Sequence, residues 1–216
     1  MRSLTKIIAN HPMAGTWASI GDEDSTREFT VSVSRNGDLF VSGIDRSDGE
    51  AFVISDVAWE GKAALRFEAL MPSTGHRTRN LMRLLADGDL VEFQLTLSQP
   101  WRRSRPRRVG DHPLAGAWGD DDTYGRIEVL VKPVASGLLV SGRSRRFGER
   151  HVISDVHWDG TTLSFSSLVP STGQRTRHAL HSPPDGDTVR HELTLIDLWQ
   201  RKEVGGREDD STSRSA

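Results

Sequence analysis

The sequence contains no cysteine, no long apolar run and no large excess of charge of one sign. Without cysteine there are no disulfides, no thiolate nucleophiles and no cysteine-based zinc sites. No apolar run is long enough to cross a bilayer as a helix. The net charge of −2 gives no general attraction to nucleic acid or to membranes. Residues 1–10 offer only Ile7 and Ile8 as an apolar stretch, too short for a signal peptide, so a cytoplasmic protein without a membrane partner is expected.

Several motifs that carry chemistry are also missing from the sequence. It has no glycine-rich phosphate loop, no nucleophile elbow and no paired carboxylates at metal-ligand spacing. No stretch has a convincing helical period. We therefore expect neither a cofactor nor a metal ion.

What the sequence does contain is an internal repeat. The segment Pro-Ser-Thr-Gly at 72–75 returns 98 residues later at 170–173, and the opening HPMAGTW at 11–17 returns as HPLAGAW at 112–118. The offset between copies drifts by only a few residues, which indicates duplication. We expect one repeat at 11–103, an arginine-rich linker at 104–111, a second repeat at 112–202 and a disordered tail at 203–216.

Within each copy the apolar residues recur with a period of two. Phe29, Val31 and Val33 alternate with polar residues, and Asn36-Gly37 follows as a tight-turn signal. The same scheme predicts about seven or eight short strands per copy. A regular meander leaves two unpaired edges unless it closes. The predicted fold is therefore all-β: two tandem antiparallel meander barrels related by a pseudo-twofold, each with its core inside.

The two ends of each copy resemble the lipocalin-like (calycin) barrels. The resemblance is carried by a Gly-x-Trp on the first strand and a Trp followed two residues later by Arg on the last: Gly15, Trp17, Trp101 and Arg103, then Gly116, Trp118, Trp199 and Arg201. In that family the first tryptophan closes one barrel end and a basic side chain stacks across it, a favourable cation–π contact. The resemblance implies binding of small, mostly apolar molecules, and some members are enzymes.

Two arginine pairs are the first candidate ligand-binding residues. Arg77 and Arg79 share one face of a regular strand, as do Arg175 and Arg177. If that face is internal, the guanidinium groups can hold a carboxylate or phosphate head group. The alternative is that both pairs lie on the solvated outer face, where arginine is usually found.

Asp56 and Asp155 are the first catalytic candidates, each following a serine inside an apolar run. A β-bulge could aim either carboxylate inward for acid–base work, with a histidine such as His157 as its partner. The alternative is an aspartate that accepts local backbone hydrogen bonds at a bend.

Histidine is concentrated in the second copy, where His191 replaces a phenylalanine that is expected to face inward. A histidine metal site is one interpretation. The spacing does not support it, and a duplicated metal site should occur in both copies. Surface or singly hydrogen-bonded histidines are the favoured reading, and if the copies have diverged, the second is the more polar inside.

Trp59 and Trp158 are either core residues or a stacking surface for a ligand. The arginines between 102 and 108 could contact nucleic acid, but Trp101 is the single aromatic residue beside them, so a solvated linker is favoured. The first functional hypothesis is binding of a small apolar or amphipathic molecule, with an arginine pair holding its anionic end. A cofactor-free barrel isomerase or cyclase using Asp and His is the second, and a non-catalytic structural or interaction module the third. The sequence leaves open whether the protein forms a homodimer.

Overall fold

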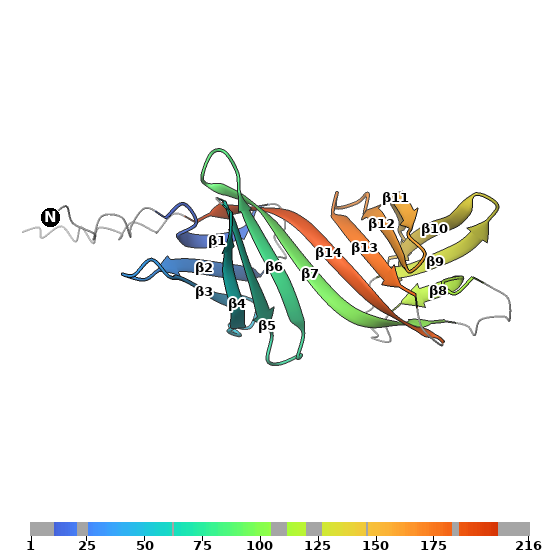
Figure 1. Ribbon diagram of the computed structural model, residues 1–216, viewed down its shortest axis with the longest axis horizontal. Coiled ribbons are helices and arrows are strands. Elements are labelled where there is room, and N and C mark those ends of the chain that lie inside the picture. The colour runs from blue at the N-terminus through green and yellow to red at the C-terminus, as the bar shows by residue number, and fades with distance from the viewer. Residues whose placement is uncertain are drawn as a thin grey trace, which may run out of the picture.

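A computed structural model describes residues 11–20, 26–61, 63–104, 112–119, 127–145, 147–182 and 186–202, and the regular elements among them are strands (Figure 1). The linker residues 105–111 and the tail 203–216 lie outside the described residues. The strands are β1 (Gly15–Ser19), β2 (Arg27–Val33), β3 (Leu39–Asp45), β4 (Val53–Glu60), β5 (Ala64–Leu70), β6 (Arg77–Leu84), β7 (Leu90–Arg103), β8 (Gly116–Gly119), β9 (Ile127–Val134), β10 (Gly137–Ser144), β11 (Arg150–Trp158), β12 (Thr162–Leu168), β13 (Arg175–His181) and β14 (Thr188–Arg201).

The alternation of apolar and polar residues decides which side of each strand is buried. On β5, Leu65 and Phe67 are fully buried while Arg66 between them is exposed. The same pattern recurs on β12 with Leu163 and Phe165. Strands β5 and β12 therefore each have one core face and one solvated face, as the period of two predicts.

Strands β7 to β14 form a closed antiparallel barrel of eight strands. Each pairs with the next along the chain, from β7–β8 to β13–β14. The ring closes because β14 pairs back onto β7. The prediction of an all-β fold with a closed antiparallel barrel is confirmed.

Strands β1 to β6 extend the sheet from the two long strands of this barrel. β6 pairs with β7, and β1 pairs with β14. At the free edges of this extension, Ile44 of β3 forms an isolated bridge with Ala51, which precedes β4. The extension thereby curls around an interior of its own (Figure 1).

The two long strands, β7 and β14, cross the middle of the molecule side by side (Figure 1). They pair from Thr188↔Arg102 to Gln200↔Leu90, and each therefore borders both interiors. At the centre, Thr96 faces Thr194 and their hydroxyl oxygens lie 2.9 Å apart. Equivalent positions of the two copies thus meet each other at the middle of this ribbon.

The expectation that each copy closes on itself is wrong in one respect: the last strand of each copy crosses over. The end of β7 carries Trp101 into the core of the β7–β14 barrel, and the end of β14 carries Trp199 into the core beside β1. Both strands have 14 residues, well beyond the usual five or six, and are long enough to serve two interiors.

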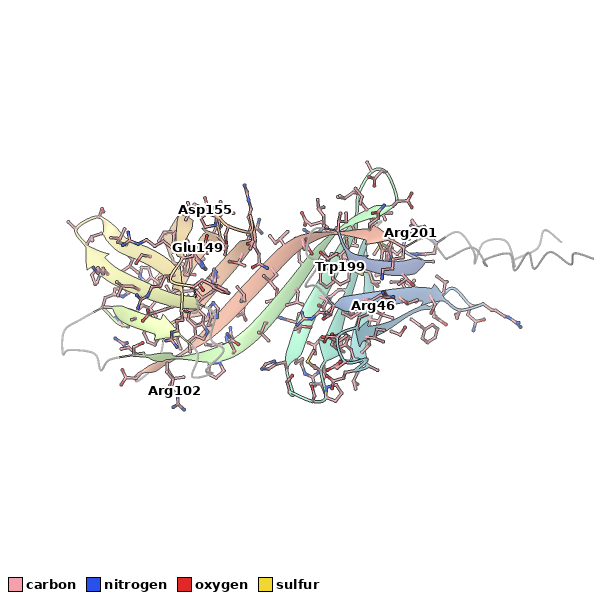
Figure 2. The ribbon with its side chains drawn as sticks, turned by 180° about the vertical axis from the view of Figure 1, so that it is seen from behind. Arg46, Arg102, Glu149, Asp155, Trp199 and Arg201 are labelled. Atoms are coloured by element: carbon pink, nitrogen blue, oxygen red, sulfur yellow. The ribbon has the colours of Figure 1, made fainter. Side chains whose placement is uncertain are left out.

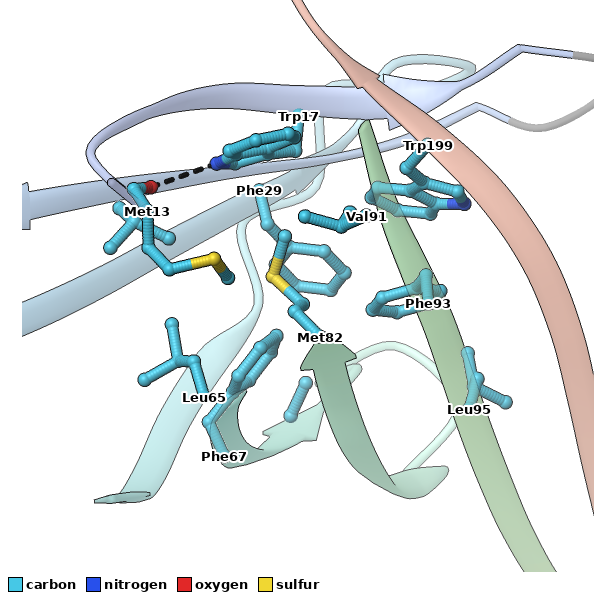
Figure 3. Packing of buried hydrophobic residues seen from close by; sticks show 12 residues of the cluster. Met13, Trp17, Phe29, Leu65, Phe67, Met82, Val91, Phe93, Leu95 and Trp199 are labelled. Carbon is cyan, nitrogen blue, oxygen red and sulfur yellow. Dashed lines mark hydrogen bonds between the residues drawn. The ribbon is translucent and has the colours of Figure 1, made fainter. Parts of the chain in front are cut away.

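The two interiors have separate apolar cores. The first core (Figure 3) consists of Met13, Trp17, Phe29, Val31, Leu65, Phe67, Ala69, Met82, Val91, Phe93, Leu95 and Trp199. The second core consists of Trp101, Leu114, Trp118, Val129, Val131, Val140, Leu163, Phe165, Leu180 and Val189. The first is richer in phenylalanine.

Candidate functional site

One end of each interior is closed by a tryptophan under an arginine. The Trp118 indole N–H donates to the Leu114 carbonyl at 2.8 Å, and the Arg103 guanidinium lies 4.4 Å from the centre of the Trp118 ring. Trp17 and Arg201 repeat the arrangement at 4.9 Å. This is the contact that the resemblance implies, but each arginine stacks on the tryptophan of the other copy, because β7 and β14 cross over.

The repeated Pro-Ser-Thr-Gly segment ties two loops together. The backbone N–H and the hydroxyl of Ser171 both donate to the Glu149 carboxylate, at 2.8 and 2.7 Å. Ser73 holds Glu50 in the same way. These bonds, with the charge of His151, hold the pKa of Glu149 below its usual value. The near-identity of the segment in both copies therefore has a structural explanation.

The arginine pairs point away from the interior. Arg77 bonds to Glu68 at 2.9 Å and Arg79 to Glu192 at 3.2 Å, both with more than half of the side chain exposed. Arg175 and Arg177 are exposed as well. The expected internal anion site is thus not formed by these side chains, since the alternation of β6 and β13 buries the residues after them, threonine and then asparagine or histidine.

Asp56 and Asp155 occupy β-bulges, as one of the two interpretations expected. The register shifts at both sites, and both residues have positive φ, 53° and 55°. The carboxylates nevertheless point outward: Asp155 is exposed and accepts a bond from Ser154 at 2.9 Å (Figure 2). Bonds from Ser154 and Ser166 and the charge of Arg177 lower its pKa. His157 is also exposed, so these three residues do not form an internal acid–base site.

Trp59 and Trp158 lie half-buried against the two cores, near the closed ends. The Trp158 ring meets His112 edge-on at 5.1 Å, and Trp59 meets His11 at 4.7 Å. Burial lowers the pKa of both histidines. The tryptophans therefore pack mainly as core residues at the barrel ends.

The closed barrel holds an internal chain of polar side chains that the individual motifs did not reveal. The Thr176 hydroxyl lies 2.7 Å from Nε2 of His178, whose Nδ1 lies 3.0 Å from Nε2 of His191. All three are buried. His191 stacks on Trp101 with ring centres 3.5 Å apart, and His178 stacks on Phe165 at 4.7 Å. We call His178 and His191 the buried histidine pair.

Both members of the buried histidine pair are neutral. Burial is the main cause that lowers the pKa of His178 to about 3, and the neighbouring His151 adds to it. Burial and the neighbouring histidines also hold the pKa of His191 well below its usual value. Each ring therefore has one N–H and one lone pair available for hydrogen bonding.

Two nitrogen atoms at this site lack a hydrogen-bond partner within the described part of the chain: Nδ1 of His191 and Nε1 of Trp101. Their residues are 0% and 2% exposed. A buried polar atom without a partner costs about 1–3 kcal/mol, and native proteins usually satisfy it with protein, water or a ligand. The two rings are stacked, so both unpartnered nitrogen atoms belong to one aromatic stack inside the closed barrel.

The equivalent positions beside β1 are filled and satisfied. Phe93 replaces His191 and stacks on Trp199 at 4.0 Å, and the Trp199 N–H donates to Asp197 at 3.0 Å. Asn80 replaces His178. Sequence reasoning noted the inward parity of His191 and the greater polarity of the second copy. It did not find that the two histidines meet, which depends on the β13–β14 register.

Two equivalent glycines have different surroundings in the two interiors. A Cβ on Gly43 would lie 2.4 Å from the Phe29 ring, whereas one on Gly142 would meet Ile153 at 3.4 Å, an ordinary contact. The cross-strand partner of Gly43 is Phe29, and that of Gly142 is the smaller Val129. The surroundings of Gly142 are therefore less crowded than those of Gly43.

This difference predicts unequal effects of the same substitution. Gly43→Ala is expected to lower the free energy of unfolding by about 1–3 kcal/mol, because the added methyl overlaps Phe29. Gly142→Ala should change it by less than about 1 kcal/mol. Urea unfolding of both variants checks this expectation, and equal losses would contradict the difference in packing.

A small recess lies on the other side of the ribbon, in the first interior. Its lining residues are Arg27, Phe29, Phe52, Ala69, Met71, His76, Thr78 and Leu95. Its volume of about 30 Å³ accommodates one or two water molecules, far below the 300–1,000 Å³ typical of ligand pockets. Neither member of the buried histidine pair lines this recess.

Among the described residues, no group of three or more His, Cys, Asp or Glu side chains is arranged to hold a metal ion. Nor does that part of the chain include a helix with the length and apolarity needed to cross a membrane. No known protein family, curated protein or solved structure matches the chain.

Proposed function

We propose that this protein binds one small amphipathic molecule inside the closed barrel, beside the buried histidine pair. The observation that carries the proposal is the presence of two buried nitrogen atoms, on Trp101 and His191, without partners among the described residues. A small molecule that pairs with them removes the cost of leaving them unsatisfied. The surrounding rings and aliphatic residues of the second core suit its apolar part.

We further propose that the chain is a duplicated lipocalin-like barrel with two barrel units about a pseudo-twofold at Thr96 and Thr194. The equal register on both sides of this point supports the duplication. The Trp–Arg contact at each end supports the likeness to calycins. In this view one unit has kept or gained a polar interior, and the other has a filled aromatic core and a structural role.

The polar end of the ligand is assigned to the Trp101 and His191 nitrogens and not to the arginine pairs. Arg175 and Arg177 are exposed on the outer face of β13 and cannot reach the interior from there. The isomerase or cyclase alternative has less support, because Asp155 bonds to Ser154 on the same outer face. A purely structural role is favoured for β1–β6 by their apolar core.

Four monosubstituted benzenes test the proposal: toluene, benzamide, benzoate and benzylammonium. They share one ring and differ in the polarity and charge of the head group. Saturation-transfer NMR and calorimetric titration should show that at least one of them binds, with one molecule per chain. His191→Phe, which installs the residue found at the equivalent position 93, should abolish that binding.

Arg175→Ala serves as the matched control, since its side chain lies outside the barrel, and it should bind like the unaltered protein. If none of the four compounds binds, or if His191→Phe binds them unchanged, the closed barrel is not the ligand site and the proposal fails.

A further inference from the structure

The hydrogen-bonding pattern of the closed barrel also restricts the chemistry of the ligand, given the proposed function on which this step rests. We infer that its polar end is an uncharged group with both a hydrogen-bond acceptor and a donor, of the carboxamide type. Three features lead to this class. The Trp101 indole can only donate a hydrogen bond, Nδ1 of His191 can be either a donor or an acceptor, and the hydrogen-bonded chain has no charged member.

The indole of Trp101 fixes the first requirement. Its Nε1 carries a hydrogen and can only donate. No acceptor for this hydrogen occurs among the described residues, although the equivalent Trp199 donates to Asp197. A ligand that satisfies it must therefore bring an acceptor oxygen or nitrogen.

The histidine chain sets the second requirement. If His178 donates from Nδ1 to His191, then Nδ1 of His191 carries a hydrogen and is a second free donor. If instead His191 donates from Nε2, its Nδ1 is a free acceptor and His178 donates to Thr176. A primary amide suits both arrangements, because its oxygen can accept from one or both rings and its NH₂ group can donate to Nδ1.

The third requirement comes from charge. The hydrogen-bonded chain has no charged member, and burying an ion beside uncharged groups is costly. The nearby cation on β7, Arg103, already binds the carbonyls of Pro113 and Ala115 and the carboxylate of Asp187. A carboxylate would lack a counter-charge here, and an ammonium group would face the Trp101 donor.

The aromatic stacking defines the rest of the molecule. Trp101 and His191 are stacked with 26° between their planes, and Phe165 and His178 with 5°. A flat ring can pair with aromatic side chains in the offset-stacked or edge-to-face arrangements that such rings prefer. The ligand class is thus a small planar molecule with a neutral amide-like substituent.

The four probes distinguish this class from the others. At pH 7.5, benzamide should bind at least tenfold more tightly than toluene, which leaves both nitrogens unpaired, and at least tenfold more tightly than benzoate or benzylammonium. Calorimetric titration of the unaltered protein gives the four dissociation constants directly.

Trp101→Phe tests the role of the indole N–H, because it keeps an aromatic ring and removes the donor. It should reduce the preference for benzamide over toluene to less than about threefold. Trp199→Phe is the matched control, since its N–H already has a partner in Asp197, and the preference should stay intact.

Failure of this inference is distinct from failure of the proposed function. Binding of toluene or of a charged probe as tightly as benzamide, or an unchanged preference in Trp101→Phe, would overturn the amide-like head group and leave a ligand site in the barrel. Absence of binding by all four probes would overturn both.

Discussion

Lowering the pH from 7 to 5 should reduce the free energy of unfolding by up to about 4 kcal/mol through the buried histidine pair alone. The folded-state pKa of His178 is about 3, and that of His191 also lies well below its ordinary value of 6.5. In the unfolded chain both take up protons near pH 6.5, while in the folded protein both stay neutral. Their contribution is therefore fully present above pH 6.5 and is lost as the pH falls toward 3.

The double variant His178→Asn, His191→Phe isolates this contribution. It places at both sites the residues that the first copy carries at the equivalent positions, Asn80 and Phe93. Urea unfolding at pH 7 and pH 5 should show that most of the pH dependence is gone. A smaller part should remain, because burial also lowers the pKa of His11, His112 and His151.

His157→Ala is the matched control for that experiment, because His157 is exposed on β11. It should keep the pH dependence of the unaltered protein. Equal stability of the unaltered protein at the two pH values, or an unchanged loss in the double variant, would show that the pair is not buried and neutral.

Cutting the chain between the copies should leave the two fragments associated in one complex. With a specific protease site inserted within 105–111, complete cleavage is expected to yield two fragments that elute together at the size of the 24.0 kDa chain. The reason is that β7 and β14 pair along nearly their whole length, and each end supplies the arginine that covers the other copy's tryptophan.

Size-exclusion chromatography of the cleaved protein, with a denaturing gel to show that cleavage is complete, measures this directly. Two separate folded fragments under native conditions would mean that each copy closes on its own. Association that persists until the fragments unfold supports strands shared between both interiors.

The strands of this fold could be predicted because the information is local. Alternation such as that of Phe29, Val31 and Val33 identifies a half-buried strand, and Asn36-Gly37 identifies the turn that follows. The crossing of the two copies could not be predicted in this way. Nothing in the neighbourhood of Trp101 or Arg103 specifies which copy they will close, since this depends on the pairing of β7 with β14.

The candidate site could likewise be predicted only where local sequence patterns carry the information. The period of two indicated that His191 faces inward, and comparison of the copies indicated a more polar second interior. That His178 contacts His191, and that Trp101 from the first copy stacks on the pair, follows from strand register and from the crossing. For the arginine pairs both faces stayed open, because a shared face does not say which face is internal.

Nitrogen NMR of the histidine rings tests the buried pair most simply. Spectra recorded from pH 8 to pH 5, under conditions where the protein stays folded, report the protonation of each ring nitrogen. His178 and His191 should remain neutral throughout, each with one protonated nitrogen and with a hydrogen bond between them. Titration of either ring near pH 6.5 in the folded protein would contradict a closed interior around the pair, and with it the ligand site proposed there.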